Sequence, residues 1–173
     1  MLFRSLQGIC RDDTGHVYWS FTTTLVKTDS RGAVVGKIET PNHHGDLCHR
    51  QGKLYVAVNF GKFNHVDGLA DNWIYTYNAA DLKLLDRVSV PQVAHGAGGI
   101  AYHDGRFMVV GGLPDGVEEN YVYEYDQQLQ FRKRHVIPSG HTKLGIQTAT
   151  YSDGSWWFGC YGNTLLKVNT SLD

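Results

Sequence analysis

Residues 104–111 read DGRFMVVG, a turn glycine followed by a run of strand-forming residues. The same pattern recurs as TGHVYWSF at 14–21, QGKLYVAV at 51–58 and DGSWWFGC at 153–160. A polar residue with glycine is typical of hairpin turns, and Val, Tyr, Trp and Phe favour strands. Each copy therefore predicts a tight turn that leads into a β-strand.

A second landmark follows each copy, a short β-rich run that ends in a polar turn. These runs are LVKTDSRGAVV at 25–35, IYTYNAADLKLL at 74–85, YVYEYDQQLQF at 121–131 and LLKVNTSLD at 165–173. A unit of about 50 residues built only from short strands is the signature of a β-propeller. We predict an all-β fold with four-stranded antiparallel blades and no helix, because no segment repeats with a period of 3.6.

The expected blades cover residues 6–41, 42–91, 92–138 and 139–173 of one domain, 1–173. The expected strands are 7–11, 16–22, 25–28, 33–39, 46–50, 53–59, 73–77, 82–90, 99–102, 106–111, 121–125, 129–137, 147–151, 155–161 and 164–168.

The fourth blade lacks an outer strand in this sequence, so about 3.75 blades are present. Two interpretations follow: residues 1–6 complete a four-bladed ring, or the sequence is a fragment of a larger ring. We favour the fragment, because propellers usually have four to eight blades and residues 1–6 are short. We also expect the true start to be missing, since residues 2–5 read like a sequencing-library adapter end.

Composition excludes several classes of function. Sixteen basic and 17 acidic residues give a net charge of −1, and they are spread evenly along the chain. This balance does not favour a nucleic-acid partner, and no apolar stretch approaches the ~20 residues that span a membrane. Three widely spaced cysteines do not form a disulfide framework.

Histidines follow the proline that closes each outer strand: His43 and His44 after Pro41, His95 after Pro91, and His141 after Pro138. These segments link the rim of one blade to the inner strand of the next, so we expect them at the mouth of the central channel. Imidazole is the commonest metal ligand and titrates near neutrality. We predict that His44, His95 and His141 form a catalytic cluster or a divalent-metal site.

Neighbouring polar residues would support this cluster. Asp46 and Gln147 begin inner strands, and we predict that they bind ligand together with His43. The alternative is structural: histidines before an inner strand often hydrogen-bond within the blades. The long polar loops at 60–72 and 112–120 are expected on the same face, where loops on a rigid scaffold often carry function.

The DGxLYV-like and DGxWWF-like strand openings resemble the propeller group of NHL-repeat proteins, streptogramin lyases and gluconolactonase-like hydrolases. The resemblance implies a channel-mouth site for a small polar substrate, and hydrolysis or elimination assisted by a metal or a histidine. The ligands of the gluconolactonase-like metal site have no match in this sequence. The competing prediction is a non-catalytic scaffold that binds a protein partner.

Overall fold

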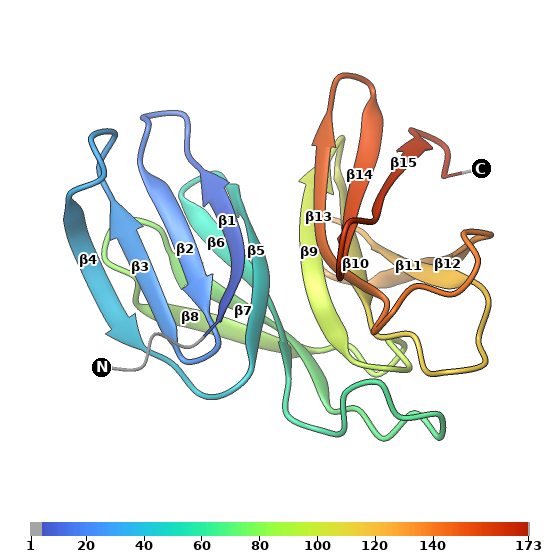
Figure 1. Cartoon of the computed structure of the whole chain (residues 1–173). Coiled ribbons are helices and arrows are strands. Elements are labelled where there is room, and N and C mark those ends of the chain that lie inside the picture. The colour runs from blue at the N-terminus through green and yellow to red at the C-terminus, as the bar shows by residue number, and fades with distance from the viewer. Residues whose placement is uncertain (1–4, 173) are drawn as a thin grey trace.

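The computed structural model describes residues 5–172, and the described residues form strands, turns and loops only. Fifteen strands make four antiparallel sheets of four, four, four and three strands, each in chain order. The sheets are arranged as the blades of a propeller (Figure 1). The predicted fold class is therefore confirmed. No helix long and apolar enough to cross a membrane occurs in this part of the chain.

Each blade runs from an inner strand to an outer strand. The strands are β1 Leu6–Arg11, β2 Val17–Phe21, β3 Thr24–Thr28, β4 Val34–Glu39, β5 His44–Arg50, β6 Lys53–Asn59, β7 Asn72–Asn78, β8 Leu84–Ser89, β9 Ala97–His103, β10 Arg106–Gly111, β11 Asn120–Tyr125, β12 Phe131–Ile137, β13 Ile146–Ser152, β14 Ser155–Cys160 and β15 Leu165–Asn169. The fourth blade, β13–β15, has three strands within the described residues. The expectation that residues 1–6 close the ring and the expectation that residues 2–5 derive from an adapter both involve residues 1–4. These four residues lie outside the described part of the chain.

The outer strands begin later than predicted, at Leu84 instead of 82 and at Phe131 instead of 129. Leu82 and Leu129 have φ angles of 60° and 58°, the left-handed region, and belong to the preceding turns. Each donates its N–H to the first turn residue, Asn78 or Asp126. Both leucine side chains are buried, so packing holds a conformation that leucine rarely adopts.

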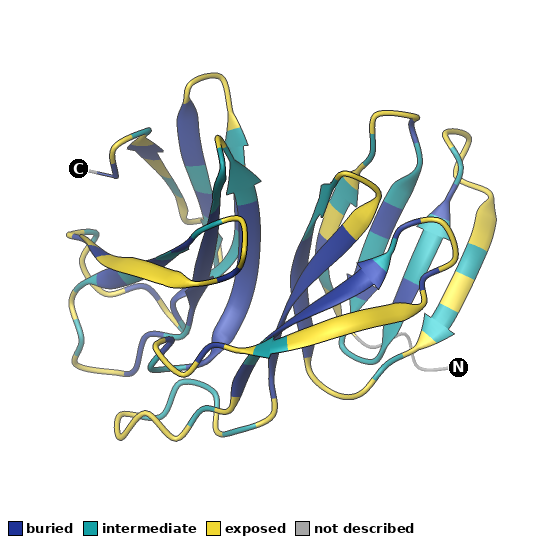
Figure 2. Cartoon of the chain, turned by 180° about the vertical axis from the view of Figure 1, so that it is seen from behind, coloured by how far each residue is buried: buried dark blue, intermediate teal, exposed yellow. Residues whose placement is uncertain are grey.

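The hydrophobic core lies between neighbouring blades. Side chains on a strand point alternately to its two faces, and β6 shows this clearly. Leu54 and Val56 pack with Tyr18 of the first blade, whereas Tyr55 packs with Phe107 of the third. In the second and third blades the inner and middle strands are accordingly largely buried, and the outer strands β8 and β12 are largely exposed (Figure 2).

Glycines allow the inner strands to approach one another at the propeller axis. A Cβ atom on Gly45 would lie 2.3 Å from the carbonyl oxygen of Gly98, and one on Gly99 would lie 2.8 Å from that of Gln147. Both distances are shorter than real contacts, so a side chain at either position would push the strands apart. The glycine run at 96–99 therefore serves close backbone packing.

Candidate functional site

A pocket of about 320 Å³ lies at the face where the strand links meet. Its floor includes Gly45 and Gly98, the two glycines whose backbones touch near the axis. The lining residues come from strand ends, links and loops of all four blades. The lining residues are Ser5, Gln7, Thr22, His43, His44, Gly45, Asn59, Phe63, Ala97, Gly98, Leu144, Gln147 and Tyr161. This is the channel mouth that the repeat predicts.

His44 lies at the inner edge of this pocket but turns into the protein. Its Nδ1 is 2.8 Å from the carbonyl oxygen of Pro41, and its Nε2 is 2.7 Å from the hydroxyl of Tyr77. The carbonyl can only accept, so Nδ1 carries the hydrogen and Nε2 accepts from Tyr77. Burial lowers the pKa of His44 to about 4, although the Pro41 bond opposes this shift. The ring is neutral near pH 7, and both its nitrogens are occupied.

His95 and His141 do not line the pocket, and each holds a long loop. Nδ1 of His95 is 3.1 Å from the carbonyl oxygen of His65, and Nδ1 of His141 is 3.1 Å from that of Val117. The same ring atom thus contacts a backbone carbonyl at all three repeat positions. This regularity favours the structural alternative for these two histidines.

The structure does not bring the three predicted metal ligands, His44, His95 and His141, together. Among residues 5–172, no group of three or more His, Cys, Asp and Glu side chains is placed to hold a metal ion. The physical reason is the side-chain direction: His44 is engaged by its own blade, whereas His95 and His141 each face a different loop. Similar positions in the repeat placed the three residues on one face of the propeller without making their rings converge.

Asp46 lies beneath the pocket floor and is 3% exposed. Its Oδ2 accepts a hydrogen bond of 3.0 Å from the N–H of Ala149, and the backbone N–H groups of Ile9 and Leu47 also donate to this carboxyl. Burial raises its pKa to about 8, and the three hydrogen bonds only partly offset this effect. Asp46 therefore connects the inner strands of the first, second and fourth blades, and it does not line the pocket.

Gln147 and His43 line the pocket, and their role in ligand binding stays a prediction. Nε2 of Gln147 donates to the carbonyl oxygen of Leu144 at 2.5 Å, which leaves Oε1 as the acceptor. Nε2 of His43 lies 3.2 Å from the amide nitrogen of Asn42. In this arrangement Nε2 accepts the hydrogen bond and Nδ1 carries the hydrogen.

The sequence analysis did not identify several of the pocket residues. Thr22, Asn59 and Tyr161 lie at or just after the ends of second strands, at similar positions in three repeats. That shared position was the available signal, because second strands end on the same face as the links. Gln7 had a similar signal, because it is the second residue of β1 as Gln147 is of β13, whereas Phe63 lies in a long loop and has no repeated position.

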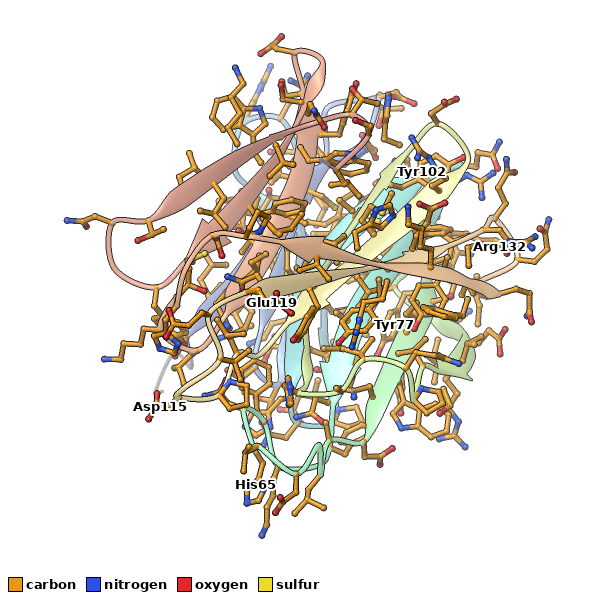
Figure 3. All side chains as sticks on the ribbon, turned by 90° about the vertical axis from the view of Figure 1, so that its right-hand side faces the viewer. His65, Tyr77, Tyr102, Asp115, Glu119 and Arg132 are labelled. Atoms are coloured by element: carbon orange, nitrogen blue, oxygen red, sulfur yellow. The ribbon has the colours of Figure 1, made fainter. Side chains whose placement is uncertain are left out.

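The two long loops lie at the end of the molecule that carries the pocket. Figure 3 shows His65 and Asp115 on loops at one end and Tyr102, at the end of an inner strand, toward the other. The loop from β6 to β7 extends furthest below the blades in Figure 1. Phe63 of this loop packs against Gly96, where a Cβ atom would lie 2.3 Å from the Phe63 ring.

Several solved structures share this architecture. A glutaminyl cyclase from Myxococcus xanthus superposes with a TM-score of 0.71 and 13% identity, over 98% of this chain and 67% of that one. The Pan2 WD40 domain of Neurospora crassa superposes with a TM-score of 0.58 and 9% identity, over 96% and 50%. BamB of Moraxella catarrhalis gives 0.53 and 16%, over 97% and 48%. The chain is a β-propeller.

These likenesses show the fold and no particular activity. No protein-family model matches the chain, and no curated protein matches it. The similar propellers include an enzyme, the glutaminyl cyclase, and also BamB and a WD40 domain. Function on such a fold has to be argued from the site itself.

Proposed function

We propose that this propeller binds a small polar molecule in the channel-mouth pocket. The observation that carries the proposal is the pocket, which combines backbone glycines, amide and hydroxyl side chains and two aromatic rings. Ligand sites are typically concave and largely apolar, with a few polar groups that orient the ligand. Phe63 and Tyr161 supply flat apolar surface, and Gln7, Thr22 and Gln147 supply polar atoms.

His43 is the candidate for acid–base catalysis in this pocket. Unlike His44, it has a ring nitrogen, Nδ1, with no partner among the described hydrogen bonds. An imidazole within reach of a bound ligand can act as a general base or acid. A hydrolase or lyase reaction of this kind is the catalytic form of the proposal, and a protein-binding scaffold stays the alternative prediction.

A ligand screen followed by pocket variants tests the proposal. Mixtures of small polar molecules are screened by ligand-observed NMR, and hits are titrated against Gln147→Met and Tyr161→Ala. Both variants should weaken binding at least about tenfold, because each removes a contact surface of the pocket. Gln127→Met, on the turn between β11 and β12, is the control and should bind like the parent. Equal binding by parent and pocket variants would overturn the proposed location.

His43→Gln separates binding from catalysis. If the protein is an enzyme that uses this imidazole, the variant should lose turnover of a hit while it keeps the affinity for it. Unchanged turnover would remove His43 from the chemistry.

A further inference from the structure

We propose that the channel-mouth pocket selects uncharged ligands and discriminates against anions and cations of the same shape. The inference rests on the proposed function and adds the ligand class. The ligand would be a neutral molecule with hydroxyl or amide groups and a ring face that can stack on an aromatic side chain.

The first support is the absence of charge in the lining. Among the described residues that line the pocket, none is Asp, Glu, Lys or Arg. The chain as a whole carries 33 such residues, 16 basic and 17 acidic, so their exclusion from this pocket is informative. A charged ligand would find no described counter-ion there.

The second support is that the two histidines in the lining, His43 and His44, are placed as neutral rings. His44 is 1% exposed, and its nitrogens are paired with Pro41 and Tyr77, so it cannot turn to meet an anion without losing both hydrogen bonds. Its lowered pKa agrees with a neutral ring. His43 meets the pocket with a single Nδ1–H donor, which suits a ligand carbonyl or hydroxyl.

The third support is that most amide groups are partly engaged. The side-chain oxygen of Asn59 accepts from the N–H groups of Gly61 and Asp71, each at 3.0 Å. Its nitrogen donates to the carbonyl oxygen of Gly61. Gln147 retains its oxygen as an acceptor and one Nε2 hydrogen as a donor. These amides can therefore hydrogen-bond a ligand, but none of them carries a formal charge.

Asp46 is the only buried Asp or Glu among the described residues, and its environment agrees with the inference. It is covered by the floor, bonded to three backbone N–H groups, and neutral below about pH 8. It therefore does not attract cations into the pocket at pH 7. Moving an unpaired charge out of water is costly, whereas a neutral hydrogen-bonding group loses less, so the lining favours neutral ligands.

Matched probes test the inference at pH 7. One set is glucose, glucuronate and glucosamine, which share a pyranose ring and differ in charge. The second set is nicotinamide and nicotinate, which share an aromatic ring. Each probe is titrated into the full chain and followed by ligand-observed NMR. We expect the neutral member of a set to bind at least about tenfold more tightly than its charged partners.

A lysine introduced into the pocket tests whether the missing charge is what disfavours anionic ligands. Gln7→Lys replaces a polar pocket residue on β1 by a cation, and within each probe set it should shift the ratio of affinities about tenfold in favour of glucuronate or nicotinate over the neutral member. Gln128→Lys makes the same change on the exposed turn after β11 and should leave all affinities as in the parent. Folding of each variant is checked by its unfolding temperature.

The outcomes separate the two proposals. Tighter binding of the neutral probes, reversed by Gln7→Lys, supports both. Equal or tighter binding of charged probes overturns the ligand class but keeps the pocket as the binding site. Failure of both neutral probes to bind overturns the ligand class as stated, and an empty ligand screen would overturn the proposed function itself.

Discussion

Asp46 should make the stability of the propeller depend on pH, and Asp46→Asn should remove this dependence. The pKa of Asp46 in the folded protein is raised from 3.8 to about 8. Between these values the folded state holds a proton that the unfolded state releases, so the free energy of unfolding falls as the pH rises. The stabilisation is complete below about pH 3.8 and is lost as the pH rises through about 8.

His44 has the opposite effect over part of this range. Its pKa is lowered from 6.5 to about 4, so its contribution rises with pH between these values and is constant above 6.5. Between pH 6.5 and pH 8, therefore, the effect of Asp46 on the free energy of unfolding can be measured separately from that of His44. One pKa unit corresponds to about 1.4 kcal/mol, and the parent should lose roughly 2 kcal/mol relative to Asp46→Asn across this interval. Asn resembles the protonated carboxyl in shape and should fold.

The assay is urea denaturation of parent and variant at several pH values from 6.5 to 8. The difference between their free energies of unfolding is the quantity of interest, because it cancels groups that both proteins share. Asp86→Asn, an exposed carboxyl on β8, is the control and should follow the parent. A difference that stays constant across the interval would refute the reasoning about Asp46.

Three further predictions concern the same architecture. Tyr77→Phe removes the donor to Nε2 of buried His44 and should cost about 1–3 kcal/mol in chemical denaturation, whereas Tyr161→Phe, half exposed, should change stability by less than about 0.5 kcal/mol. Gly45→Ala places a Cβ atom against the carbonyl of Gly98 and should lower stability by about 1–3 kcal/mol. Gly36→Ala, whose nearest contact is Leu82 Cδ1 at 3.5 Å, should cost nothing; similar losses for both would argue against crowding at the axis. Hydrogen exchange should be at least about tenfold faster for the outward-facing amides of β15 than for those of β11, which is paired on both sides, and equal protection would mean that the β15 edge is covered.

Much of the fold followed from local signals in the sequence. Gly52, Gly105 and Gly154 all have positive φ in the tight turns that the sequence predicts. The left-handed Leu82 and Leu129 were missed, because a leucine in that conformation depends on burial by a neighbouring blade. The same limit applied to the pocket: of the residues that line it, the sequence singled out Gln147 and His43 but not Phe63.

The sequence by itself determined the repeat, its turns and the face on which the links gather, since these depend on residues close together in the chain. The tertiary structure decided where each ring on that face points. Packing turns His44 toward Tyr77, aims His95 and His141 at two loops, and buries Asp46 among three inner strands. Side-chain direction and pKa depend on contacts between residues far apart in the chain, and a similar position in each repeat does not contain that information.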